Sequence, residues 1–173
     1  MTDLKPLKDK TAIVTGAGRG IGMAIAEGFA KAGANVSIAA RSKEDLSSVE
    51  TQIKKFNSNV VAFQTDVSQS EDVDALVNNT LKSFGQIDIM VNNAGVYKEL
   101  ALVPFPDQIL TPPSVTRSSN ERMTDDEFRQ IIDTNIGGVF YGCRAVAPSM
   151  IDQKYGKIIN ISSIAESKAS TLQ

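Results

Sequence analysis

The chain of 173 residues contains no histidine, no tryptophan and a single cysteine, Cys143. The absence of histidine excludes nucleophilic serines or cysteines that are activated by an imidazole. It also excludes the usual ligand sets of zinc sites. A single cysteine excludes an internal disulfide and fits a reducing compartment. We therefore expect an intracellular protein, in the cytoplasm first and in an organelle as the alternative.

Extremes of charge and hydropathy are absent as well. The net charge is −2, and the 18 basic residues are dispersed along the chain, so we expect no nucleic-acid partner. No apolar stretch is long enough to cross a bilayer, and the first ten residues are polar and lack the apolar centre of a signal peptide. The hydrophobic content of 42% and the charged content of 22% are those of an ordinary globular domain.

Short apolar runs rich in valine and isoleucine alternate with helical patterns along the chain. Their continuous apolarity is typical of parallel strands covered on both faces, and the alternation predicts βαβ units. We predict one α/β domain over residues 1–173, a doubly wound, Rossmann-like parallel sheet with strand order 3-2-1-4-5 and no strand after the fifth. The predicted strands are 11–15, 35–40, 59–65, 87–92 and 157–162.

The boundaries of the helices carry recognisable signals. Ser42 starts one helix, and Gly33 and Gly85 end two others. Ser68 with Glu71, and Thr124 with Glu127, have the spacing of capping boxes. One apolar face is predicted for the helix after Thr124, made of Phe128, Ile131, Ile132, Asn135, Ile136, Val139, Phe140 and Cys143.

Residues 96–123 form a connection of 28 residues that holds four of the six prolines. Loops longer than about 12–15 residues are usually functional or disordered. This one is either a surface excursion that packs its own apolar residues, or a substrate rim or oligomer contact.

The turn from the first predicted strand into the next helix is rich in glycine. Residues 15–22 read Thr-Gly-Ala-Gly-Arg-Gly-Ile-Gly, which fits Thr-Gly-x-x-x-Gly-x-Gly and does not fit G-x-G-x-x-G or the P-loop. Glycines let a phosphate approach the backbone closely, and the helix N-terminus supplies N–H donors and a positive dipole. A tight strand–helix turn without a ligand is the alternative.

Further motifs follow in order. Asp66-Val67 ends the third run, Asn92-Asn93-Ala94-Gly95 ends the fourth, and Asn160-Ile161-Ser162-Ser163 ends the fifth, while Asp133-Thr134-Asn135 lies in the long helix. Together with the glycine-rich turn, these motifs resemble the classical short-chain dehydrogenase/reductase family over essentially the whole chain.

The resemblance implies an oxidoreductase that moves a hydride between a nicotinamide cofactor and the carbonyl or secondary-alcohol carbon of a small-molecule substrate. It implies that Ser163 polarises the substrate oxygen and that Asn135 supports a proton path through water. It also implies a homo-oligomer, a dimer or a tetramer, for a full-length member. The cofactor-binding residues that it implies are Gly16, Arg19, Gly20, Ile21, Gly22, Arg41, Ser42, Asp66, Val67, Asn93, Ala94 and Gly95.

The end of the second predicted strand distinguishes NADP(H) from NAD(H). An acid there accepts from the ribose 2′-hydroxyl of NAD, whereas a basic residue accommodates the 2′-phosphate of NADP. Here Arg41 follows Ala39-Ala40, and Arg19 lies inside the glycine-rich turn. We therefore expect NADP(H) to be preferred over NAD(H); the alternative is that both arginines are solvated surface charges.

The resembling family uses a Tyr-x-x-x-Lys pair after the serine, in which the lysine lowers the pKa of the tyrosine. No tyrosine follows Tyr155, and Lys168 is the only lysine after Ser163. We therefore expect the chain to be a truncated form without the family's last strands, inactive by itself, and marginally stable or self-associating because its fifth strand and long helix lose cover. A non-catalytic nucleotide-binding or interaction protein is the alternative.

Overall fold

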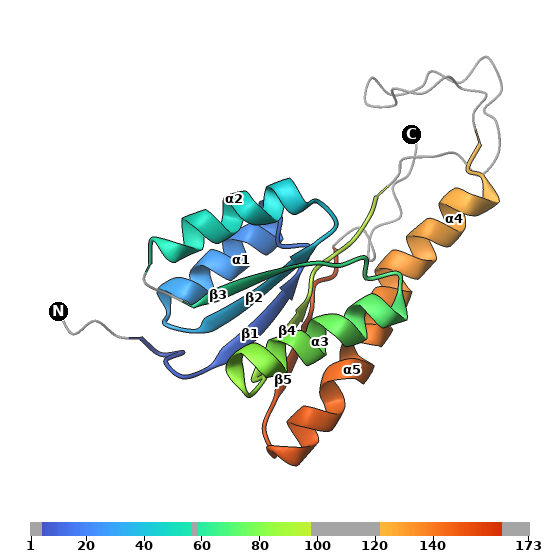
Figure 1. Cartoon of the computed structure of the whole chain (residues 1–173). Coiled ribbons are helices and arrows are strands. Elements are labelled where there is room, and N and C mark those ends of the chain that lie inside the picture. Colours follow the sequence, from blue (N-terminus) through green and yellow to red (C-terminus); the bar gives the residue numbers. More distant parts are fainter. Residues whose placement is uncertain (1–4, 57–58, 98–121, 164–173) are drawn as a thin grey trace.

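The computed structural model describes residues 5–56, 59–97 and 122–163 (Figure 1). Its sheet has five parallel strands in the order β3-β2-β1-β4-β5, which confirms the predicted α/β class and strand order. The third, fourth and fifth strands are shorter than predicted. The strands are β1 (Thr11–Thr15), β2 (Asn35–Ala40), β3 (Val60–Gln64), β4 (Ile89–Asn92) and β5 (Lys157–Asn160).

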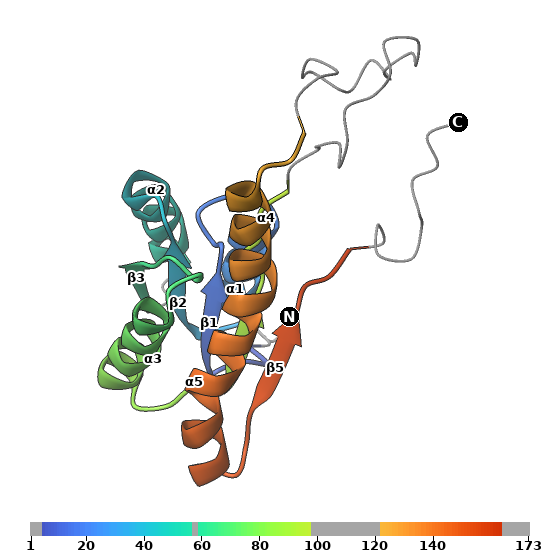
Figure 2. The ribbon, with the colours of Figure 1, turned by 90° about the vertical axis from the view of Figure 1, so that its right-hand side faces the viewer.

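Helices cover both faces of this sheet (Figures 1 and 2). One core cluster joins Val14 and Val36 of the sheet to α1 and α2, and a second joins Ile13 and Met90 to α3 and α5. Strands β1 and β4 are buried along their whole length, as expected for parallel strands that are covered on both faces. The helical segments are α1 (Gly20–Lys31), α2 (Lys43–Lys54), α3 (Ser70–Phe84), α4 (Asp125–Ile132), the π-helical η1 (Asp133–Gly137) and α5 (Gly138–Asp152).

Two predicted helix starts are confirmed and one is wrong. The Ser42 hydroxyl accepts from the Asp45 N–H at 3.1 Å, and Thr124 forms a capping box with Glu127. The predicted capping box at Ser68 does not form, since α3 begins at Ser70 and no side chain caps it. Ser68 precedes the N-cap position of α3, and its Oγ donates to Asp66 Oδ1 at 2.8 Å.

Three residues of the apolar face predicted for the long helix are exposed, and the helix packs on the sheet through other residues. Phe128, Ile136 and Phe140 are 55%, 61% and 58% exposed. Small residues let the helix approach the sheet closely: a Cβ on Gly142 would lie 2.8 Å from Met90 Cε of β4. The residues that this helix buries are Thr134, Gly138, Gly142, Val146 and Met150.

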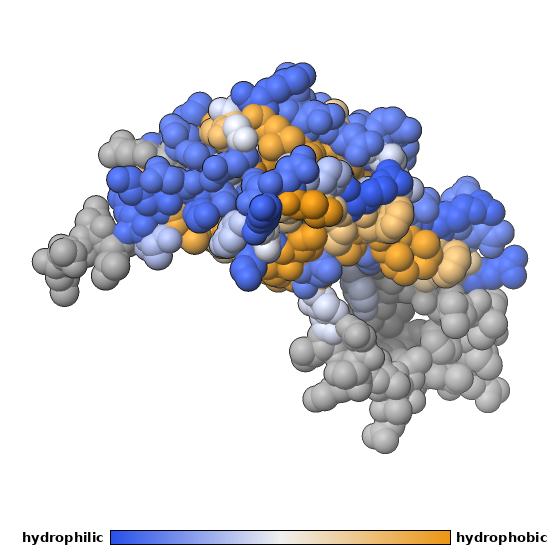
Figure 3. Space-filling view, turned by 90° about the horizontal axis from the view of Figure 1, so that it is seen from below, coloured by the Kyte–Doolittle hydropathy of each residue, from blue (hydrophilic) through white to orange (hydrophobic). Residues whose placement is uncertain are grey.

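Strand β5 forms one edge of the sheet and is exposed along its length (Figure 2). The side chains of Ile158, Ile159 and Ile161 are partly open to solvent. On the face of the molecule shown in Figure 3, apolar areas lie between polar ones. Within the described residues, the fifth strand is exposed, and so are Phe128, Ile136 and Phe140 of the apolar face of the long helix. None of the helices that the structure describes is long and apolar enough to cross a membrane.

A buried carboxylate ties together the amino ends of β1, β4 and β5. Asp88 accepts from the Thr11 N–H at 2.8 Å, from Gln86 Nε2 at 2.7 Å and from Lys10 Nζ at 2.9 Å. The Asp88 carbonyl accepts from the Lys157 N–H at 2.9 Å. The hydrogen bond from Lys10 to Asp88 raises the pKa of Lys10 against the opposing effect of desolvation.

This pair predicts an alkaline dependence of stability. Because the pKa of Lys10 is raised in the folded state, its contribution is complete below the unfolded value of about 10.4 and is lost as the pH rises through the folded value. We expect the difference in unfolding free energy between wild type and Lys10→Met to be constant at neutral pH and to shrink above about pH 10. Urea titrations over this range measure it, with Lys8→Met as the control. A difference that does not change with pH would contradict the prediction.

Candidate functional site

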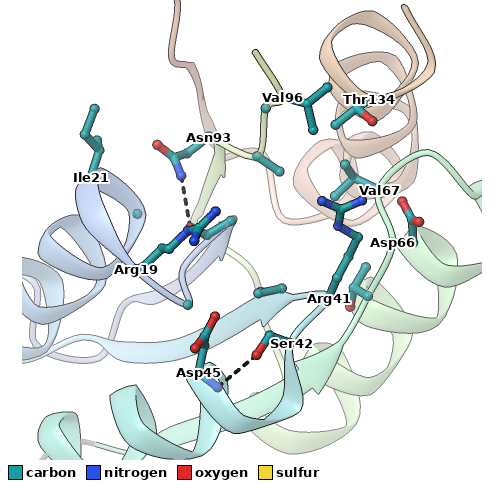
Figure 4. Close-up of a pocket in the computed structure, with 17 residues that line it drawn as sticks. Arg19, Ile21, Arg41, Ser42, Asp45, Asp66, Val67, Asn93, Val96 and Thr134 are labelled. Carbon is teal, nitrogen blue, oxygen red and sulfur yellow. Dashed lines mark hydrogen bonds between the residues drawn. The ribbon is translucent and has the colours of Figure 1, made fainter. Parts of the chain in front are cut away.

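A cavity of about 450 Å³ opens at the carboxyl edge of the sheet, between the ends of β1, β2, β3 and β4 (Figure 4). In a doubly wound sheet this edge is where crossovers diverge to opposite sides and leave room for a ligand. The lining residues are Gly16, Gly18, Arg19, Ile21, Gly22, Ala40, Arg41, Ser42, Asp45, Thr65, Asp66, Val67, Asn93, Ala94, Gly95, Val96 and Thr134.

The glycine-rich turn brings the backbone of β1 and the start of α1 into close contact. Gly16 and Gly20 have φ angles of +64° and +56°, in the left-handed region that favours glycine. Gly22 packs directly against the carbonyl of Gly16, where a Cβ would overlap. Arg19 occupies the N-cap position of α1 without a side-chain capping bond. Among the described residues, Arg19 thus leaves the first-turn N–H groups of α1 without a side-chain cap, which suits an anion.

The turn after β4 is fixed by a threonine of the neighbouring strand. The buried Thr15 hydroxyl accepts from the N–H groups of Asn93 at 3.0 Å and Ala94 at 3.1 Å, and donates to the Val91 carbonyl at 3.2 Å. Asn93 Nδ2 donates to the carbonyl of Thr15 at 2.9 Å and to that of Gly16 at 3.3 Å. The two turns that form this part of the cavity are thereby held as one unit.

The residues after β3 form a second fixed wall. Asp66 Oδ1 accepts from the N–H of Ser68 at 3.0 Å as well as from its hydroxyl, and the Asp66 N–H donates to Asp72 Oδ2 at 2.9 Å. Val67 is buried against Gly138 of α5. Asp66 and Val67 therefore face the cavity from a rigid turn.

Two guanidiniums stand at the cavity without a charged partner. Within the described residues, neither Arg19 nor Arg41 forms an ion pair. Both side chains are exposed, and Arg41 extends across the cavity toward Asp66 and Val67 (Figure 4). Unpaired guanidiniums at a cavity wall are suited to bind a phosphate through charge-assisted hydrogen bonds.

Several lining residues were not predicted from the motifs. Asp45 lies in the first turn of α2, three residues after the capping Ser42, and reaches the cavity because Gly18 has no side chain. Its position relative to that turn depends on the packing of α2, which no local motif records. Gly18, Ala40, Thr65, Val96 and Thr134 were likewise not predicted.

Of the two predicted catalytic residues, Asn135 lies beside the cavity, where it contacts the lining residue Val96. Asn135 is in η1, where its Oδ1 accepts from the Val96 N–H at 2.8 Å and its Nδ2 donates to the Val96 carbonyl at 2.9 Å. Ser163 follows β5 on the same edge of the sheet, since β5 pairs with β4 through Asn160 and Asn92. Gly20, Asn135 and Ser163 are not among the lining residues, whereas the other predicted site residues are.

Two sequence predictions fall on residues that the structure does not describe. Residues 98–121, most of the long connection, lie outside the described residues, and so does Lys168. In the described ranges 5–56, 59–97 and 122–163, no group of three or more acidic, cysteine or histidine side chains could hold a metal ion.

Comparison with known proteins identifies the family of the chain. A model of the short chain dehydrogenase family matches residues 10–173. The chain belongs to the short-chain dehydrogenase family. An uncharacterized oxidoreductase of Staphylococcus aureus is 38% identical over 96% of this chain and 64% of its own length.

Solved structures of short-chain dehydrogenases share the fold. A metagenomic short-chain oxidoreductase in complex with NADP has a TM-score of 0.77 and 35% identity over 94% of this chain and 66% of its own. An NAD⁺-bound xylitol dehydrogenase has a TM-score of 0.78 and 29% identity over 94% of this chain and 56% of its own. The chain thus spans less than two thirds of the length of these relatives. Both nicotinamide cofactors occur among these neighbours, so the choice between them depends on the residues of this site.

Proposed function

We propose that this chain forms the NADP(H)-binding part of an oxidoreductase that interconverts a carbonyl and a secondary alcohol. The observation that carries the proposal is the combination, at one cavity, of an α1 N-terminus that Arg19 does not cap and of the Arg19 and Arg41 guanidiniums, which form no ion pair with any residue that the structure describes. Such a cavity suits a ligand with a pyrophosphate and an additional phosphate.

The lining residues fit the parts of this cofactor. The N–H groups of Gly20, Ile21 and Gly22 would hold the pyrophosphate, because α1 directs its positive dipole end at the cavity. Arg19, Arg41 and the Ser42 hydroxyl would hold the 2′-phosphate. The adenine would lie against Asp66 and Val67, and Asn93, Ala94 and Gly95 would lie along the nicotinamide end. When bound, the cofactor supplies or accepts the hydride.

Asn135 and Ser163 would serve the substrate end. The Ser163 hydroxyl follows the same sheet edge and would polarise the substrate oxygen. Both polar atoms of the Asn135 amide bind the Val96 backbone, so this residue fixes the segment after Gly95. We also propose a small-molecule carbonyl or alcohol substrate, a homo-oligomeric assembly and a reducing intracellular compartment.

The test of the cofactor is the double variant Arg19→Gln/Arg41→Gln. Each lost charge-assisted hydrogen bond is worth about 1.5–3 kcal/mol, so we expect the affinity for NADPH to fall by about 100-fold or more and that for NADH to change little. Calorimetric titration of the chain with each cofactor measures both. Arg129→Gln is the control, because Arg129 pairs with Asp126 on α4 away from the cavity. Equal affinities in the wild type, or a preference for NADH, would refute the NADP(H) proposal.

Turnover separates an enzyme from a non-catalytic binding protein. With NADPH and a panel of ketones and β-ketoacyl compounds, the absorbance of the reduced nicotinamide reports hydride transfer. Reduction of any carbonyl supports the catalytic proposal for this chain. Tight NADPH binding without reduction would support the nucleotide-binding alternative.

A further inference from the structure

The cavity contains a third charge, which opposes the two arginines. Asp45 lines the cavity together with Arg19 and Arg41. Its carboxylate points from α2 toward the glycine-rich turn (Figure 4). Within the described residues Asp45 takes part in no ion pair, and its hydrogen bond with Ser42 uses the backbone N–H and leaves the carboxylate uninvolved. The carboxylate is therefore available to a ligand.

The Asp45 side chain lies directly over Gly18. A Cβ built on Gly18 would lie 2.9 Å from Asp45 Cβ and 3.6 Å from Asp45 Oδ2. The Asp45 N–H is held by Ser42 Oγ at 3.1 Å, which fixes the first turn of α2. Asp45 thus occupies the space between the β1–α1 turn and α2, where a side chain on residue 18 would otherwise be.

Helix stability alone does not explain an acid in this direction. Acidic residues in the first turn of a helix are favourable because of the helix dipole. Glu44 is in the same turn, is exposed and does not line the cavity. The dipole therefore accounts for acids at both positions but not for the placement of one of them at the ligand cavity.

The charges at the cavity point to a role in selectivity. Two guanidiniums attract a dianionic 2′-phosphate, whereas a carboxylate repels it and can accept from a free ribose 2′-hydroxyl. We propose that Asp45 is a specificity-determining residue, which moderates the preference for NADPH and lets the site also bind NADH. This inference rests on the proposed function of the site.

The experiment compares Asp45→Asn with Glu44→Gln in the full 173-residue chain. Both changes remove one negative charge from the first turn of α2 and preserve side-chain shape. For Asp45→Asn we expect the dissociation constant of NADPH to fall about tenfold and that of NADH to rise about twofold. Glu44 accepts from the Ser42 hydroxyl at 3.4 Å, and the amide oxygen of a glutamine can still accept there. For Glu44→Gln we therefore expect both constants to stay within about twofold of the wild type, because the lost charge is exposed and well screened.

The outcomes are distinct. An unchanged ratio of NADPH affinity to NADH affinity in Asp45→Asn, or an equal change of this ratio in both variants, overturns the role of Asp45 while the proposed function stands. A wild-type chain that binds neither cofactor overturns the proposed function and this inference with it. A ratio of NADPH affinity to NADH affinity that rises only in Asp45→Asn, and rises less at high salt, supports the inference.

Discussion

Replacement of Gly22 by alanine is expected to abolish detectable NADPH binding and to destabilise the fold. A Cβ on Gly22 would overlap the Gly16 carbonyl oxygen and lie 2.8 Å from the Gly16 carbonyl carbon, so the backbone of the turn must move. Overpacking of this kind costs about 1–3 kcal/mol. The shift also displaces the N–H groups proposed to hold the pyrophosphate, so we expect the affinity to fall by at least about 100-fold.

The control for this variant lies on the same helix. A Cβ on Gly28 would meet no atom within 4 Å. Gly28→Ala should therefore stabilise the chain by about 0.5–1 kcal/mol, through the higher helix propensity of alanine, and leave NADPH binding unchanged. Urea unfolding and calorimetric titration measure both effects. If Gly22→Ala bound NADPH like the wild type, the turn would not be the pyrophosphate site.

The strand order could be predicted from sequence because its signals are local and repeated. Each strand is an apolar run, each crossover contains a helical pattern, and the parallel βαβ rule limits how such units assemble. Ser42, Thr124 and Gly85 define helix ends through contacts within a few residues. Ser68 has the same local spacing, but α3 begins at Ser70 and the Ser68 hydroxyl donates to Asp66.

The buried face of the long helix could not be predicted in this way. Hydrophobicity favours a face with Phe128 and Phe140, yet the helix packs through Gly138 and Gly142. The orientation of the helix is set by close packing against the sheet. It cannot be inferred from the number of apolar residues on each face. Proximity to the sheet is a tertiary property.

The site, too, contains residues that local motifs predict and residues that only the tertiary structure brings to the cavity. The glycine-rich turn and Asn93 belong to contiguous motifs, and the structure brings them together at one cavity. Asp45 and Thr134 reach it only through the placement of α2 and η1, so no motif identified them. The roles of the predicted residues in binding and catalysis stay predictions.

The buried hydroxyl of Thr15, the first residue of the glycine-rich motif, gives the second large effect. Thr15→Val keeps the side-chain shape but leaves the N–H groups of Asn93 and Ala94 without their acceptor. An unsatisfied buried donor costs about 1–3 kcal/mol, and both N–H groups are partly buried, so we expect a destabilisation of about 2–3 kcal/mol in total. Because Asn93 and Ala94 line the cavity, we also expect NADPH binding to weaken about tenfold.

Thr11→Val, on the same strand, is the matched control. Thr11 is also buried, but its hydroxyl accepts only from Asn35 Nδ2, at 3.5 Å, and it lies at the end of β1 away from the cavity. We expect this change to cost less than about 1 kcal/mol and to leave NADPH binding unaltered. Similar losses in both variants would show that the Thr15 hydroxyl contributes only packing. A selective loss in Thr15→Val would establish that one side chain holds both the fold of the turn and the binding surface that it presents.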